Sequence, residues 1–145
     1  MDVAAAEEER RWEAVAMAFV EHYYHLLDTS RPSLAGLYDS TSLLSFEGQP
    51  EFGAEAIARR LAAAPPFDRY RHRVSTVDCQ PSPPTGGILV FVSGSLELPG
   101  EEHPSASPIA INDGLSSLSL QMFQLVPTPQ GGFVVQNDIF RLLYT

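Results

Sequence analysis

Glu47 is the residue of this chain best placed by its neighbours to do chemistry. It follows an apolar run that ends at Phe46, and it stands directly before Gly48. A carboxylate between an aromatic ring and a glycine at the end of a strand could act as a catalytic acid in a cleft or bind a cationic partner. It could also mark the point where the chain leaves the core. The residues alone leave these three interpretations open.

A histidine and a carboxylate form the second candidate site. His72 and Asp78 fall six residues apart on one expected strand, which places both side chains on the same face of a sheet. A buried histidine opposite a carboxylate is typical of proton transfer in a lyase or isomerase, and equally of a structural pair. Arg69, Arg71 and Arg73 alternate onto the opposite face, as a solvated or interface surface would.

Metal and nucleotide binding receive little support from the sequence. His22 and His25 lie three residues apart on an expected helix, but no third residue has the spacing of a metal ligand. No glycine-rich phosphate loop or nucleophile elbow is present. We therefore expect neither a metal nor a cofactor.

The predicted secondary structure that must position these residues changes at Pro66 from mainly helices to strands. Before it, apolar spacing predicts helices over residues 7–27, 33–38 and 54–64, a strand over 41–46 and a turn from Gly48. After it, segments rich in β-branched and aromatic residues predict strands over 69–79, 87–98, 118–126 and 133–144. Helices followed by hairpin-linked strands indicate an α+β fold with the helices on one face of an antiparallel sheet.

Length and composition predict a single domain over residues 1–145 of the 145-residue chain. Residues 1–9 are expected to form a disordered extension, and the small, polar, proline-containing segment 103–117 to form a flexible loop. The longest apolar run is far shorter than the roughly 20 residues that span a bilayer, and the N-terminus is unlike a signal peptide. The single cysteine, Cys79, agrees with a reducing, intracellular compartment.

The net charge is −9, and all nine basic residues are arginines. Nucleic acid is therefore not an expected partner, because phosphate binding needs a basic surface. An acidic domain suits a basic protein partner through electrostatic steering, although such a charge also serves solubility alone.

The order of several motifs along the chain resembles the nuclear transport factor 2 family, and plant members most closely. The most specific of these motifs are FVEHYY, FEGQ, STVDCQP, QMF and NDIFR, and the resemblance extends from Trp12 to Leu142. It implies a cone-shaped fold, in which a strongly bent antiparallel sheet wraps around one long and two short helices. It also implies an apolar cavity and a homodimer formed through the sheet face.

The same resemblance implies a transport adaptor rather than an enzyme. Such a protein binds the GDP form of the small GTPase Ran and the phenylalanine–glycine repeats of nucleoporins, and it carries Ran into the nucleus. The implied location is the cytoplasm, the nucleus and the nuclear envelope at pore complexes, with no membrane or nucleic-acid partner.

Site residues also follow from the resemblance. Glu47 matches an acidic residue that pairs with a cationic residue of Ran, and Phe46 lines the mouth of the cavity that receives a Ran aromatic. Glu101 and Glu102 fall where the family keeps an acidic cluster on the same face. Trp12 matches a tryptophan at the site that binds the nucleoporin repeats.

One segment departs from the family pattern. Residues 105–117 and their neighbours form a connection roughly a dozen residues longer than a tight turn needs. Two alternatives therefore stay open beside the transport adaptor. One is a small-molecule enzyme or binder of dehydratase or isomerase type, which would use His72 and Asp78 in the cavity. The other is a diverged dimeric domain that has lost Ran binding because of the long loop.

Overall fold

The structure, a computed structural model, describes residues 3–63, 71–97 and 117–144. Helices come first and then a run of strands, which confirms the α+β class and the expected set of one long and two short helices. In chain order the elements are α1 (Val3–Thr29), the 3₁₀ helix η1 (Arg31–Leu37), β1 (Tyr38–Phe46), β2 (Gln49–Phe52), α2 (Ala54–Ala62), β3 (Arg71–Ser82), β4 (Gly87–Glu97), β5 (Ser117–Pro127) and β6 (Phe133–Tyr144).

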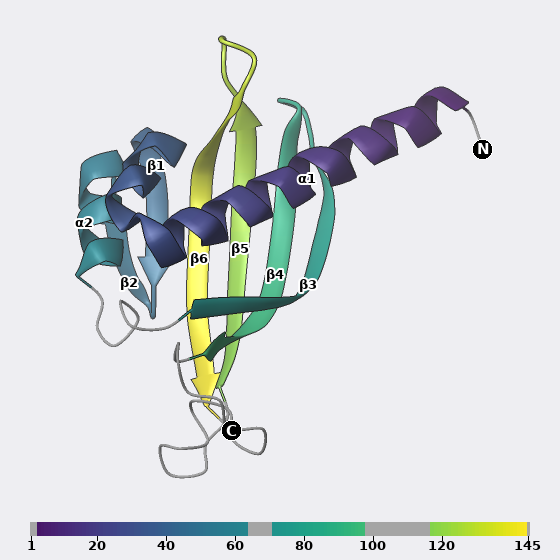
Figure 1. Ribbon diagram of the computed structural model, residues 1–145. Helices are drawn as coiled ribbons and strands as arrows, with labels where there is room; N and C mark the ends of the chain where they lie inside the picture. The colour runs from purple at the N-terminus through teal and green to yellow at the C-terminus, as the bar shows by residue number, and fades with distance from the viewer. Residues whose placement is uncertain (1–2, 64–70, 98–116, 145) are drawn as a thin grey trace.

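All of these strands belong to one bent sheet with the order β2-β1-β6-β5-β4-β3. Neighbouring strands are antiparallel except β1 and β6, which are parallel. The expected bent antiparallel sheet is therefore confirmed, with this one parallel pair as the exception. Helix α1 runs across one face of the sheet, and α2 lies beside β1 and β2 at one edge (Figure 1).

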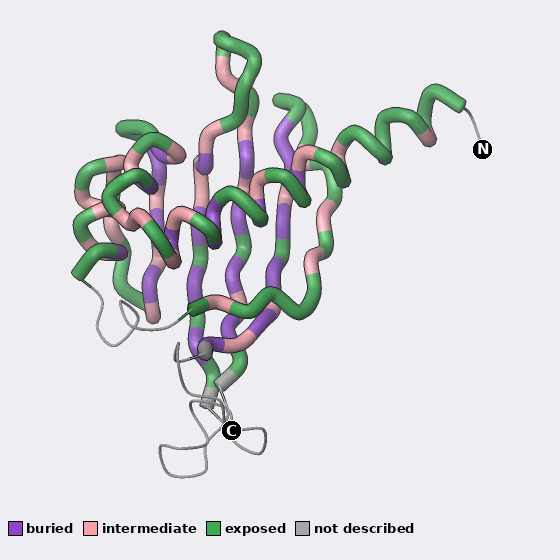
Figure 2. The backbone as a smooth tube through the Cα atoms, in the orientation of Figure 1, coloured by how far each residue is buried: buried purple, intermediate pink, exposed green. Residues whose placement is uncertain are grey.

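Helix α1 begins at Val3, so residues 3–9, which were expected to be disordered, are helical. The cause is local, because alanine, glutamate and arginine are strong helix formers and Glu7 and Arg11 are spaced for an i,i+4 pair. These first turns project beyond the sheet and are largely exposed (Figures 1 and 2). Among the described residues, no helix combines the length and the apolar character needed to cross a membrane.

Strand β2 was not expected, because only a turn was predicted after Gly48. Its four residues pair with the end of β1, and Phe46 lies opposite Gln49. So short a strand, with Pro50 within it, gives no alternating pattern that a sequence could display. The loop expected over 103–117 lies outside the described residues, apart from Ser117, the first residue of β5.

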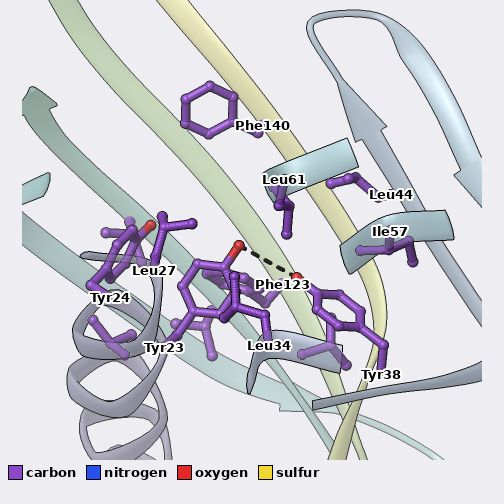
Figure 3. Packing of buried hydrophobic residues seen from close by; sticks show 14 of the residues in the cluster. Tyr23, Tyr24, Leu27, Leu34, Tyr38, Leu44, Ile57, Leu61, Phe123 and Phe140 are labelled. Atoms are coloured by element: carbon purple, nitrogen blue, oxygen red, sulfur yellow. Dashed lines mark hydrogen bonds between the residues drawn. The ribbon is translucent and has the colours of Figure 1, made fainter. Parts of the chain in front are cut away.

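The core lies between α1 and the inner face of the sheet and continues under η1 and α2. Three aromatic side chains meet there: Tyr23 from α1, Tyr38 from β1 and Phe123 from β5 (Figure 3). Tyr23 and Phe123 pack edge to face, with their ring centroids 4.8 Å apart. Arg31 closes one end of this core by donating to the carbonyl oxygen of Leu61 at 2.7 Å.

Candidate functional site

Glu47 occupies a strained turn between β1 and β2. Its φ of 52° and the φ of 85° at Gly48 are both in the left-handed region, which glycine adopts without cost and glutamate does not. The backbone N–H of Glu47 donates to the carbonyl oxygen of Phe140 at 3.1 Å, and its carboxylate accepts the N–H of Leu142. Glu47 therefore ties the turn to β6, a structural role that sequence reasoning did not identify.

Phe46, the neighbour of Glu47, is buried at the end of β1. Its ring stacks on that of Phe140, with 5.0 Å between the centroids and 12° between the planes. The guanidinium carbon of Arg60, on α2, lies 5.3 Å from the centroid of the Phe46 ring, within the range of a cation–π contact. The turn, β6 and α2 thus bring together a carboxylate, two stacked rings and a guanidinium.

A small cavity lies behind these rings. Leu27, Leu61, Phe46 and Phe140 form its apolar walls, and polar side chains that include Tyr23 and His72 complete it. Its volume is about 10 Å³, close to the least that one water molecule needs. Small-molecule sites have volumes of about 300–1,000 Å³. In this conformation the cavity holds no substrate-sized ligand, and a partner side chain enters only if the mouth opens.

A network of buried polar side chains lies next to the cavity. Asp138, fully buried on β6, accepts hydrogen bonds from the Tyr38 hydroxyl at 2.7 Å and from the amide nitrogen of Gln121 at 2.8 Å. The same amide nitrogen donates to the Tyr23 hydroxyl at 3.1 Å, and the Tyr24 hydroxyl donates to the amide oxygen of Gln121 at 2.6 Å. Because these groups satisfy one another, the network fixes the packing of α1 against β1, β5 and β6.

Burial sets the protonation behaviour of this network. It raises the pKa of Asp138 from 3.8 to about 6, against the opposing effect of the hydrogen bonds from Gln121 and Tyr38. It also raises the pKa of Tyr23, and the nearby Asp138 carboxylate adds to that rise. The tyrosines therefore stay neutral. The sequence did indicate that Asp138 faces inward, because it lies at alternate positions with Phe140 and Leu142 along β6.

His72 pairs with Asp28 rather than with Asp78. Its Nδ1 lies 3.3 Å from Oδ1 of Asp28, and its backbone N–H lies 3.2 Å from both oxygens of that carboxylate. Asp28 belongs to the last turn of α1, so the pair joins this helix to the start of β3. The ring of His72 also packs against Tyr24, with 5.3 Å between the centroids.

The expectation that His72 and Asp78 share a face was wrong, because β3 contains an irregularity. The register with β4 shifts between Val74 and Thr76, so an extra residue reverses the alternation of side chains beyond it. Val77 and Cys79 face the core after the shift, and Asp78 is exposed on the other face. The proton-transfer pair proposed for an enzyme is therefore not assembled.

The remaining predicted residues are spread over the molecule. Trp12 is partly buried on α1 and packs against the core. Glu101, Glu102 and Arg69 lie outside the described residues. His22 and His25 are exposed. Within the part of the chain that the structure describes, no group of three or more His, Cys, Asp or Glu side chains could hold a metal ion.

The outer face of the sheet carries a row of exposed apolar side chains. Phe91 on β4 lies opposite Met122 on β5, and Met122 lies opposite Ile139 on β6. These side chains are 39%, 40% and 51% exposed, respectively. A contiguous apolar row on a folded surface is typical of an interface.

Comparisons with known proteins agree with this architecture. Residues 15–142 match the family model described as the nuclear transport factor 2 (NTF2) domain. The chain is 52% identical to nuclear transport factor 2B of Arabidopsis thaliana over 132 residues, which cover 91% of this chain and 94% of the relative. It is also 52% identical to nuclear transport factor 2 of Oryza sativa subsp. japonica, over 91% of this chain and 97% of that protein.

A solved structure supports the same assignment. Nuclear transport factor 2 from Cryptosporidium parvum superposes with a TM-score of 0.75 at 32% sequence identity. The match covers 92% of this chain and 95% of that protein. The likeness therefore extends over nearly the whole of both chains.

Proposed function

The chain belongs to the nuclear transport factor 2 family, and from that premise we propose that it is a nucleocytoplasmic transport adaptor that binds Ran in its GDP form. The observation that carries this proposal is that Glu47 directly follows Phe46, whose ring stacks on Phe140 beside a small cavity with partly apolar walls. A partner aromatic would enter this hollow, and Glu47 would orient it by pairing with a neighbouring cation.

Other contacts complete the proposed adaptor. Glu101 and Glu102 would extend the acidic rim toward Ran. Trp12 would bind the phenylalanine–glycine repeats of nucleoporins, since a partly buried indole suits a small aromatic ligand. The adaptor would thereby move between cytoplasm and nucleus through the pore complexes of the nuclear envelope.

We also propose a homodimer, held by the apolar row on the outer face of the sheet. The three strands that carry Phe91, Met122 and Ile139 are hydrogen-bonded neighbours, so a second copy can cover the row without rearrangement of the sheet.

A binding assay with Ran in both nucleotide states tests the proposed function. The purified chain should retain Ran-GDP and should not retain Ran loaded with a non-hydrolysable GTP analogue. Equal retention of both forms, or of neither, would contradict the proposal.

A deletion variant tests the alternative of a diverged domain. Residues 105–116 can be removed without touching β5, which begins at Ser117. If the full chain binds Ran-GDP as tightly as the deletion variant does, the long connection does not hinder the partner. If binding appears only after the deletion, the chain has lost Ran binding through its loop.

A further inference from the structure

The hydroxyl group of Tyr38 has two hydrogen-bond partners but only one proton to donate. Its oxygen lies 2.7 Å from Oδ2 of Asp138 and 3.3 Å from the hydroxyl oxygen of Tyr23. Tyr38 can therefore donate to one of these oxygens at a time, and it must accept a proton from the other for both bonds to exist. Figure 3 shows the hydroxyl groups of Tyr23 and Tyr38 facing each other in the core. The three side chains thus form a row of hydrogen bonds that can run in either direction.

The protonation state of Asp138 sets this direction. An ionised carboxylate can only accept, so Tyr38 then donates to Asp138, and Tyr23 donates to Tyr38. When Oδ2 of Asp138 carries a proton, it donates to the Tyr38 oxygen, and Tyr38 donates to Tyr23. Oδ1 accepts from the amide nitrogen of Gln121 in both states. Because burial raises the pKa of Asp138 to about 6, both states are populated around that pH.

The direction of these bonds changes what the cavity offers to a ligand. Tyr23 lines the cavity, and its oxygen also accepts from the amide nitrogen of Gln121 at 3.1 Å. When Asp138 is protonated, both acceptor positions of the Tyr23 oxygen are therefore occupied, and its own proton is released from Tyr38. That proton is then available to an acceptor in the cavity. When Asp138 is ionised, the same proton is held within the buried network.

We propose that Asp138, Tyr38 and Tyr23 form a pH-sensitive hydrogen-bond relay, which directs the Tyr23 O–H into the cavity when Asp138 is protonated and away from it when Asp138 is ionised. The cavity thereby becomes a site for one small hydrogen-bond acceptor at acidic pH, of about the size of a water molecule. The relay belongs to the free protein, so this inference does not depend on the proposed function.

Other ionisable groups near the relay come from α1, η1 and β3. Helix α1 contributes Tyr24, whose hydroxyl donates to Gln121, and Asp28, which pairs with His72 of β3. Arg31 of η1 acts on Tyr23 through its charge. Burial raises the pKa of Tyr24 and of Tyr38 well above the ordinary value, so these phenols stay neutral. A titration of His72 or Asp28 would act without Asp138, and substitution of Asp138 separates the two sources.

NMR spectroscopy of the chain labelled with ¹³C at the ζ carbon of tyrosine tests the relay, because this carbon bears the hydroxyl and its chemical shift responds to hydrogen bonding. The chain has five tyrosines, and single substitutions by phenylalanine assign their resonances. Between about pH 4 and 8, the resonances of Tyr23 and Tyr38 should shift in one step with a common midpoint near pH 6.

Three variants separate the relay from other causes of a shift. Asp138→Asn should abolish the step and hold both resonances at their acidic positions, because its amide also donates to the Tyr38 oxygen. Tyr38→Phe should remove most of the Tyr23 step, because the relay is interrupted. Tyr24→Phe is the matched control: it removes a neighbouring hydroxyl that donates to Gln121 instead, and the Tyr23 step should remain.

The inference is overturned if the unaltered chain shows no step, or if Tyr23 and Tyr38 shift with different midpoints. It is also overturned by a step that persists in Asp138→Asn, which would belong to a group such as His72 or Asp28. An undiminished Tyr23 step in Tyr38→Phe would show that the charge of Asp138 acts on Tyr23 directly, without a relay. If Tyr38→Phe does not fold, the midpoints in the unaltered chain and the resonance positions in Asp138→Asn decide.

Discussion

The carboxylate of Glu47 accepts the N–H of Leu142, and the same residue stands beside the aromatic mouth where a partner would bind. Its local role and its proposed role in partner binding use different properties. The hydrogen bond to β6 needs only an acceptor oxygen, whereas selection of a cationic partner needs the negative charge. Substitutions can therefore separate the two roles.

Glu47→Gln should keep the bond to Leu142 and lose most Ran-GDP affinity. Glu47→Lys should lose both, and its free energy of unfolding should fall by about 1–3 kcal/mol because the buried backbone donor is left without an acceptor. Urea unfolding and Ran-GDP titration of both variants measure the two effects. Normal Ran binding by Glu47→Gln would show that the charge is not part of the site, and loss of folding in that variant would show that the residue is purely structural.

Asp138 is a fully buried residue whose protonation affects the stability of the fold. Its pKa of about 6 in the folded protein lies above the ordinary 3.8, so the folded state binds more protons between these values. Its contribution to stability is therefore complete below about pH 4 and is lost as the pH rises through 6. The full difference amounts to about 3 kcal/mol.

Asp138→Asn should abolish this dependence, because a neutral amide can still accept from Gln121 and can donate to the Tyr38 oxygen. Urea unfolding of both proteins at several pH values from 4 to 7 measures it. The stability of the unaltered chain relative to the variant should decline across this range by about 2 kcal/mol, most of the full difference. Parallel curves would contradict the assignment, since other titrating groups are common to both proteins.

At the scale of the elements, helix α1 combines two different segments. From Ala16 to Leu27 its inward face is part of the core, and Asp28 in its last turn binds His72. The turns before Arg11 are helical but largely exposed. Only the first of these segments is fixed by tertiary packing; the second is helical through local propensity.

Removal of residues 1–9 should therefore change the free energy of unfolding by less than about 0.5 kcal/mol, as expected where exposed residues away from packing are lost. Guanidinium unfolding of the truncated chain measures this. Tyr24→Phe is the matched change in the packed part of α1, and loss of its hydroxyl, which donates to Gln121, should cost about 1–3 kcal/mol. A larger loss from the truncation than from Tyr24→Phe would contradict this division of α1.

The elements also show what the sequence could and could not predict. Strands β4, β5 and β6 were predicted because their segments are rich in β-branched and aromatic residues, and the order of the motifs made Phe46 and Glu47 candidate site residues. His72 and Asp78 were wrongly placed on one face of the sheet because one extra residue near Ser75 reverses the alternation of side chains after it. Nothing in the composition of a strand indicates such a shift in register.

At the scale of the whole molecule, the sheet has one covered face and one face that still exposes large apolar side chains. The inner face packs against α1, whereas the outer face presents Phe91, Met122 and Ile139 in register across three strands. Ile139 lies at the β6 end of this row and is the most exposed of the three. It is therefore the position where a charge should disturb the monomer least and a dimer most.

Ile139→Asp should convert a homodimer into monomers, because two buried carboxylates would face each other across a two-fold interface without compensating partners. Phe52→Asp makes the same kind of change at another exposed apolar residue, on the edge strand β2, and should leave the dimer intact. Sedimentation equilibrium measures the mass, which for Ile139→Asp should be that of one chain, 15.9 kDa. The proposed interface would be contradicted if the unaltered chain already sediments as a monomer or if the Ile139→Asp variant remains dimeric. The reason is that the row can hold two copies together only while its side chains stay apolar.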